Sequence, residues 1–259
     1  MIIVNDIEQN SKEWLQLRLG VITASRAKDF AEESKLAPLP DVKHTQEGKK
    51  HCVAWDVNGE TRIIEGTNKA KLFAEIRESL PRVYSDARQG YMAELCGQIA
   101  TGLTPEQISS KAIDWGNNYE DEARAAFAFE TGLTVEEVGF IYKDESKRFG
   151  VSPDGLIKDK KIGLEIKCPF TTKVFIEFAT CDKIKPEYYE QCQYSMWATG
   201  YDGWYFANYD PRVKGKNLYF KLIERDQAYM DKYDKAAEQF VSDMDAMLAK
   251  LNLNFGEQW

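Results

Sequence analysis

Apolar positions recur every three or four residues along several stretches of this chain, a spacing typical of amphipathic helices. Two short helices are predicted within residues 11–32, separated by a break at Leu19 and Gly20. The same spacing predicts longer helices over 68–80, 85–101, 109–131, 171–180, 186–199 and 226–251. Gly132 follows one of them, where a helix C-cap is expected.

After Gly132 the pattern changes to short runs bounded by turn residues, which favour strands. Strands are predicted over 135–142, 149–152, 155–158, 162–168, 204–208 and 218–223. Helices followed by strands, then by helix, strand, strand and helix, indicate a mixed sheet covered by helices. The fold class expected is therefore α/β, with a mixed β-sheet flanked by helices.

Residues 31–84 interrupt this framework. From 32 to 50 the prolines, Gly48 and many charges predict an exposed loop. The stretch 52–65 alternates apolar and polar residues about Asn58 and Gly59, which predicts a hairpin before the helix at 68–80. We expect a single domain over residues 1–259, with an insertion of loop, hairpin and helix at about 31–84.

The net charge of -8 argues against a surface that is positive throughout and binds nucleic acid without specificity. A nuclease with its Lys and Arg confined to one groove remains compatible with this charge. Five cysteines without a C-x-x-C pair indicate free thiols in a reducing compartment. No signal peptide and no apolar run long enough for a membrane span are found in the sequence, so a cytoplasmic protein is expected.

The candidate chemistry lies in SPDGL at 152–156 and GLEIKCPF at 163–170. Asp154 falls at a turn, and Glu165 and Lys167 project from the same face of the next predicted strand. Neighbouring carboxylates repel one another unless a cation neutralises them, and ligation by oxygen alone favours Mg²⁺ or Mn²⁺. The alternative is a surface hairpin with a solvated Glu and Lys pair.

Glu120 lies on the apolar side of the helix predicted over 109–131, because Ala123 and Phe127 follow it by three and seven positions. A carboxylate on a buried face is costly unless it is paired or bound to a metal. Glu120 is therefore a candidate metal ligand or supporting group. A structural ion pair with Arg124 is the alternative.

Seven segments in a fixed order carry a resemblance to a known family: LRLGVITASR (17–26), WGNNYEDEAR (115–124), SPDGL, GLEIKCPF, QCQYSMW (191–197), WYFANYDPR (204–212) and FGEQW (255–259). Together they resemble the lambda-exonuclease-like, YqaJ-like viral recombinase branch of the PD-(D/E)xK nucleases. The resemblance covers residues 11–30 and about 85–259. It implies a restriction-endonuclease-like core, and it offers no counterpart for the inserted segment.

The resemblance also implies roles for individual residues. Two Mg²⁺ ions would be bound by Asp154, Glu165 and the backbone carbonyl of Ile166. Glu120 would support the metal site, directly or through a water molecule, and Lys167 would act on the attacking water. Gln193 matches a position close to the reacting phosphate. A pocket for a 5′-phosphate falls on Arg18, Ser25 and Ser152, and Trp14 and Ile113 match positions at the DNA end. Taken alone, Trp14 and Ile113 are equally typical of core residues, Gln193 of a buried amide bound to backbone, and Arg18 of a solvated charge.

The function that the resemblance implies is a 5′ to 3′ exonuclease on double-stranded DNA. It would release mononucleotides and leave 3′ single-stranded tails for a single-strand annealing recombinase of a bacteriophage or prophage, in the cytoplasm of the bacterial host. A homotrimeric ring would enclose the DNA and reconcile an acidic exterior with a basic channel. The rivals are a structure-specific endonuclease of the same fold and a catalytically inactive module that binds DNA ends.

Overall fold

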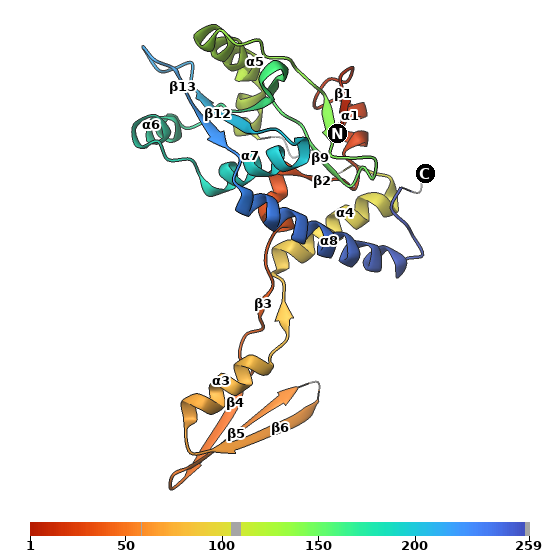
Figure 1. Cartoon of the computed structure of the whole chain (residues 1–259), viewed down its shortest axis with the longest axis vertical. Coiled ribbons are helices and arrows are strands. Elements are labelled where there is room, and N and C mark those ends of the chain that lie inside the picture. The colour runs from red at the N-terminus through yellow and green to blue at the C-terminus, as the bar shows by residue number, and fades with distance from the viewer. Residues whose placement is uncertain (58, 105–109, 257–259) are drawn as a thin grey trace. The chain divides into compact units, whose positions relative to one another are not determined.

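The computed structural model describes residues 1–57, 59–104 and 110–256. The chain forms two compact units (Figure 1). One comprises Met1–Ala31 and Gly90–Trp259, and the other comprises Glu32–Gln89. The candidate site residues named from the sequence all belong to the first, larger unit, which also contains the sheet predicted after Gly132.

The larger unit contains a mixed sheet of four strands in the order β10, β11, β12, β13. These strands span Gly155–Ile157, Ile162–Lys167, Gly203–Tyr209 and Leu218–Glu224. Strands β11 and β12 are parallel, and both outer pairs are antiparallel. The predicted mixed sheet is confirmed, and the predicted bounds of these strands differ from the observed ones by at most one residue at either end.

Helices cover both faces of this sheet. Ala123 and Phe127 of α5 (Lys111–Thr131) pack on one face, against Leu164 and Ile166 of β11. The other face packs on α6 (Thr172–Cys181) and on α7 (Pro186–Thr199), whose last eight residues are all buried. Figure 1 shows β12 and β13 between α5 above and α7 below. Because side chains alternate along a strand, Glu165 and Lys167 point away from α5 and towards α7.

Capping residues fix the ends of α5 and α7. The Ser110 side chain accepts a hydrogen bond from the backbone N–H of Ile113, and Gly132 ends α5 in the left-handed conformation at φ 68°. The predicted C-cap at Gly132 is thus confirmed. Helix α7 starts on Pro186 and ends on the left-handed Gly200. Residue 109, the predicted first residue of the helix that became α5, lies outside the described residues.

A second sheet in the larger unit has the order β1, β8, β9, β2. Its strands are short: Ile2–Val4, Phe140–Tyr142, Phe149–Val151 and Ile22–Thr23. The strand predicted over 135–142 is therefore wrong in its first half, where only an isolated bridge joins Glu136 to Leu156. The first strand was not predicted, since three residues are too few for a periodic signal.

The remaining helices of the larger unit complete one aromatic-rich core. They are α1 (Lys12–Leu17), the 3-10 helix η1 (Ala24–Arg26), α2 (Ala27–Phe30), α4 (Asp86–Thr101), which begins in the smaller unit, and α8 (Gln227–Ala249), while the 3-10 helix η2 (Lys158–Lys160) follows β10. Phe30 of α2 lies at the centre of this core, with its ring centroid 5.8 Å from Tyr194 and 5.6 Å from Phe240. No helix within 1–57, 59–104 and 110–256 combines the length and apolar character needed to cross a bilayer.

The smaller unit is a three-stranded antiparallel sheet packed on one helix. Strands β4 (Val42–Glu47), β5 (Lys50–Val57) and β6 (Glu60–Gly66) face α3 (Lys69–Ser79) through Val53, Trp55, Leu72 and Ile76. Two further strands, β3 (Lys35–Leu36) and β7 (Arg82–Val83), pair with each other. The hairpin and helix predicted here are confirmed, and Asn58 of the predicted turn lies outside the described residues.

The exposed loop predicted over 32–50 is wrong for Val42–Glu47. These residues form β4 because all six of them pair with β5. Val42 is partly buried against the small core, whereas the polar residues that follow it stay at the surface. A strand that is polar along most of its length resembles a loop in sequence, and pairing with a neighbour defines it.

Close packing on Gly163 of β11 offers a test of this core. A Cβ atom at Gly163 would lie 2.4 Å from the indole ring of Trp204, which is fully buried. We expect Gly163→Ala to lower the free energy of unfolding by about 1–3 kcal/mol, as overpacking does. Gly97→Ala in α4 is the matched control: it meets open space, and helical Ala is favoured over Gly by about 0.5–1 kcal/mol. Urea unfolding measures both, and equal stability of the two variants would contradict this packing.

Candidate active site

Asp154, Glu165 and Lys167 meet at one end of the β10–β11 pair. The Asp154 carboxylate accepts a hydrogen bond from the backbone N–H of Ile166 at 2.5 Å. The Lys167 ammonium lies 2.5 Å from Glu165 Oε1. Glu165 is only 2% exposed although it is charged. The shared face expected from E-x-K spacing is thus present, and the alternative of a solvated surface pair is wrong.

A glutamine from α7 completes the environment of Glu165. Gln191 Nε2 donates to Glu165 Oε1 at 2.7 Å. Gln193, the residue named from the sequence, is fully buried and lies elsewhere: its amide donates to the carbonyl of Glu224 and accepts from the N–H of Asp226. Sequence analysis missed Gln191, because almost every residue of this helical turn is buried and no periodicity separates the two glutamines.

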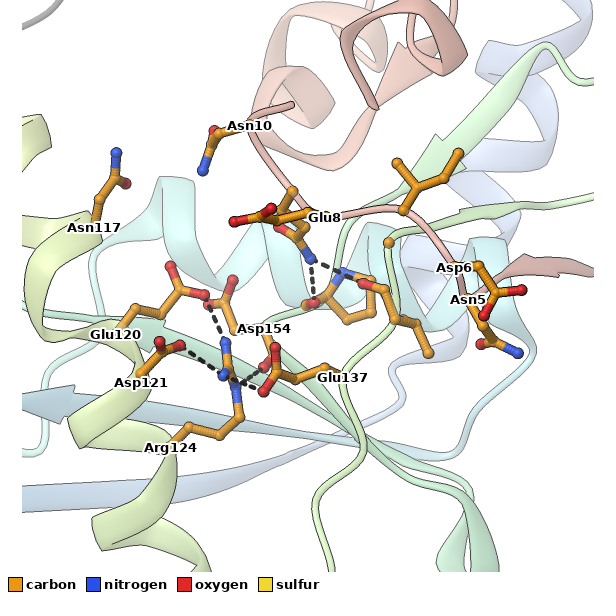
Figure 2. A pocket seen from close by; sticks show the side chains of 15 residues that line it. Asn5, Asp6, Glu8, Asn10, Asn117, Glu120, Asp121, Arg124, Glu137 and Asp154 are labelled. Atoms are coloured by element: carbon orange, nitrogen blue, oxygen red, sulfur yellow. Dashed lines mark hydrogen bonds and ion pairs between the residues drawn. The ribbon is translucent and has the colours of Figure 1, made fainter. Parts of the chain in front are cut away.

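Glu120 approaches the same site from α5, held by Arg124 (Figure 2). The guanidinium lies 2.9 Å from Glu120, 2.9 Å from Asp121 and 2.8 Å from Glu137. Its Nε donates to the backbone carbonyl of Asp154 at 2.7 Å. Arg124 therefore ties the helix to the turn that carries Asp154, and the ion pair considered for Glu120 is present beside the candidate metal ligands.

The three carboxylates act on one another electrostatically. Burial raises the pKa of Asp154 well above its ordinary value, and the charges of Glu165 and Glu120 raise it further. Burial also raises the pKa of Glu120, although the Arg124 charge opposes this. Burial would lower the pKa of Lys167, but Glu165 and Asp154 outweigh it and raise that pKa above its ordinary value. Lys167 is therefore a firmly held cation.

These side chains have the donor chemistry of a site for a hard divalent ion. Carboxylate oxygens are the ligands that Mg²⁺ and Mn²⁺ prefer, and mutually repelling carboxylates gain from a cation between them. Within the described part of the chain, no group of three or more His, Cys, Asp or Glu side chains is gathered closely enough to enclose an ion. Arg124 and Lys167 hold Glu120 and Glu165 in ion pairs instead. The residues fit such an ion by charge and donor type.

The residues assigned to a 5′-phosphate pocket lie close together. Arg18 and Ser25 line a cavity of about 370 Å³ with Trp14 and Tyr91. The Arg18 guanidinium stacks 4.0 Å from the centre of the Trp14 ring, and burial lowers the Arg18 pKa to about 10. Ser152 is linked to this cavity because its hydroxyl accepts a hydrogen bond from the Trp14 indole N–H at 3.1 Å.

Trp14 itself is buried, and its indole N–H also donates to the carbonyl of Gly139. This placement favours the core role considered for Trp14, with the ring supporting Arg18. Ile113 is not the core residue considered as its alternative role, because it is 48% exposed on α5. It lines a cavity of about 520 Å³ that also includes Glu120, Asp154 and Lys167.

Comparison with known proteins gives independent evidence on the fold and the family. The sequence profile of the YqaJ-like viral recombinase domain matches residues 73–202. The putative uncharacterized protein ExoD of Escherichia coli (strain K12) is 49% identical over 78 residues, which are 30% of this chain and 90% of ExoD.

Solved structures match over nearly the whole chain. The alkaline exonuclease of Laribacter hongkongensis is 31% identical with a TM-score of 0.67, over 93% of this chain and 96% of that enzyme. The same enzyme in complex with dAMP is 30% identical with a TM-score of 0.68, over the same shares of the two chains. A phage-related exonuclease of Haemophilus somnus, at 13% identity and a TM-score of 0.55 over 89% of this chain and 96% of its own, matches in fold. The predicted α/β fold of PD-(D/E)xK type is confirmed.

The two glutamines of α7 can be separated by experiment. Gln193→Ala removes two buried hydrogen bonds to backbone, so we expect the free energy of unfolding to fall by about 2–4 kcal/mol. Gln191→Ala removes a donor to Glu165, so we expect cleavage of linear duplex DNA to slow by about tenfold or more, the effect of about 1.4 kcal/mol on a barrier. Urea unfolding and initial cleavage rates measure the pair. A loss of activity in folded Gln193→Ala that exceeds the loss in Gln191→Ala would reverse these roles.

Proposed function

Because this chain belongs to the YqaJ-like viral recombinase family, we propose that it is a metal-dependent exonuclease that digests one strand of duplex DNA from a 5′-phosphorylated end. The observation that carries the proposal is the meeting of the buried Glu165 with the half-buried Asp154 and Lys167, beside Glu120. Alignment with an alkaline exonuclease over nearly the whole chain supports the same reaction.

Asp154, Glu165 and the Ile166 carbonyl are the residues that would hold Mg²⁺ or Mn²⁺, with Glu120 in support and two ions as the expected number. Such an ion polarises a phosphodiester and lowers the pKa of a bound water. Lys167, as a held cation, neutralises charge that develops on the phosphate. Gln191 keeps Glu165 oriented through its amide, and Arg124 keeps the Asp154 turn against α5.

The polarity of digestion is part of the proposal. A guanidinium forms paired hydrogen bonds with a terminal phosphate, and hydroxyls add further donors. The cavity that contains Arg18 and Ser25 lies in the same unit as the candidate catalytic residues, and Trp14 joins it to Ser152, two residues before Asp154. Binding of a 5′-phosphate there would bring the next phosphodiester towards Asp154 and Glu165.

We further propose that the product is a 3′ single-stranded tail that passes to a single-strand annealing recombinase, and that a homotrimeric ring gives processive digestion. The smaller unit, Glu32–Gln89, corresponds to the segment proposed as an insertion in a single exonuclease domain. The proposals of a 3′ single-stranded tail and of a homotrimeric ring both rest on the family resemblance.

Lys167→Ala tests the reaction. Loss of this cation removes the positive charge beside the reacting phosphate, so we expect digestion of linear duplex DNA with Mg²⁺ to fall by about a hundredfold or more, on the order of removing one transition-state donor. Thermal unfolding should still be cooperative, but at a lower temperature, because Glu165 loses its ion-pair partner. Unchanged digestion would show that the site is elsewhere, and cutting of covalently closed circular duplex by the wild-type protein would favour an endonuclease.

Arg18→Ala tests the end sensor. We expect the variant to lose the preference of the wild-type protein for 5′-phosphorylated over 5′-hydroxyl ends, since a terminal dianion interacts with the guanidinium more strongly than a hydroxyl does. Rates on the two duplexes, labelled to show which strand survives, measure the preference. An equal loss of rate on both substrates would contradict the assignment. Arg26→Ala is the matched control and should keep the preference, because Arg26 lines the same cavity but is paired to Asp29 and Glu94.

A further inference from the structure

An aromatic side chain at the edge of the candidate active site has no part in the proposed chemistry. Phe170 lies in the connection between β11 and α6, three residues after Lys167, and it is 47% exposed. Single exposed apolar residues are common on protein surfaces, but this one lines the same cavity as Glu120, Asp154 and Lys167.

The backbone of Phe170 is held in place. The Arg212 guanidinium donates to the carbonyls of Pro169 and Phe170 at 3.1 and 3.0 Å. The same guanidinium bonds Asp210, which is fully buried, and stacks 4.2 Å from the centre of the Trp115 ring. Trp115 in turn makes an edge-to-face contact with the Phe170 ring, with centroids 6.0 Å apart. The ring is thus presented at the surface by a prearranged support.

The cavity beside Phe170 has an apolar part and a cationic part. Ile113, Phe170 and Val174 line it with apolar surface, and Lys167 and Lys185 line it with positive charge. Both ammonium groups lie over the Tyr188 ring, at 5.3 and 5.4 Å. A ligand that fits both parts has a flat apolar face and a nearby anion. A nucleotide within a DNA strand has both, as a base and a phosphate.

The way in which the cavities adjoin one another indicates which nucleotide would occupy the Phe170 cavity. A cavity of about 440 Å³ shares Asn10 with the Arg18 cavity, and it shares Asn117, Glu120 and Asp154 with the Phe170 cavity. The Arg18 and Phe170 cavities share no lining residue. The middle cavity therefore adjoins both of the others, with Glu120 and Asp154 at its border with the Phe170 cavity. If the terminal phosphate binds at Arg18, the bond to be cut would lie between the Arg18 cavity and the Phe170 cavity.

We propose that Phe170 stacks on the base of the second nucleotide, immediately 3′ to the scissile phosphodiester, and so positions that phosphodiester for cleavage. This inference rests on the proposed function, in which Arg18 binds the terminal phosphate. Stacking on an aromatic face tolerates any base, which suits an enzyme that must act on every sequence.

The test removes the Phe170 side chain and the base of the second nucleotide, separately and together. Single-turnover release of the first nucleotide is measured with Mg²⁺ on 5′-phosphorylated duplexes whose second nucleotide is either normal or abasic. On the normal duplex we expect Phe170→Ala to be slower by about fivefold to a hundredfold, the range of one base stack. On the abasic duplex we expect wild type to be slowed similarly, and Phe170→Ala to be no slower than wild type.

Two variants separate stacking from structure. Phe170→Tyr keeps an aromatic face and should retain wild-type rates on both duplexes. Ile176→Ala, which trims an equally exposed apolar residue on α6 outside this cavity, should leave the rates unchanged. Equal slowing by Phe170→Ala on the normal and abasic duplexes, or no slowing on either, would overturn the proposal, as would failure of Phe170→Tyr to restore the rate.

Failure of the proposed function would look different. In that case the wild-type protein would not release nucleotides from the linear duplex at all. A wild-type protein that digests the normal duplex, combined with a Phe170→Ala variant that behaves identically to it, refutes the role of Phe170 alone.

Discussion

The burial of Glu165 on an interior strand is the constraint on which the rest of the site depends. A charged carboxylate withdrawn from water is destabilising unless cations and hydrogen-bond donors surround it, and removal of one partner from such a pair costs about 3–5 kcal/mol. Here Lys167 from the same strand and Gln191 from α7 supply those partners. The parallel pairing of β11 with β12 and the packing of α7 on the sheet are therefore required both for the core and for the charge at its edge.

The central part of this site could be predicted because it depends on local geometry. Residues two apart on a strand share a face, so Glu165 and Lys167 had to lie side by side. Asp154 directly precedes β10, which pairs with the strand that carries them. The stripe of Ala123 and Phe127 likewise indicated that Glu120 faces inward. The contact of Arg124 with the Asp154 carbonyl could not be predicted from the sequence, because it joins residues 30 positions apart.

The remainder depended on tertiary structure. Gln191 and Gln193 could not be ranked from the sequence, since α7 is buried on every side over its last two turns and its pattern has no polar face. Strand β4 is mostly polar and is defined by its pairing with β5, not by burial. Ile113 has the spacing of a core residue, yet the cavity beside α5 leaves it exposed. In each case the deciding contact is with a distant segment.

The electrostatics of the site also explain why an acidic protein can act on DNA. Around Arg124 and Lys167 the carboxylates outnumber the cations, so the site by itself repels a phosphodiester. The raised pKa of Asp154 reflects this repulsion, and a divalent ion would relieve it. Binding of such an ion and approach of the phosphate would therefore be coupled, and each would strengthen the other. Lys167, Lys185 and Arg18 supply positive charge at the end of β11 and in the adjoining cavities, although the net charge of the chain is -8.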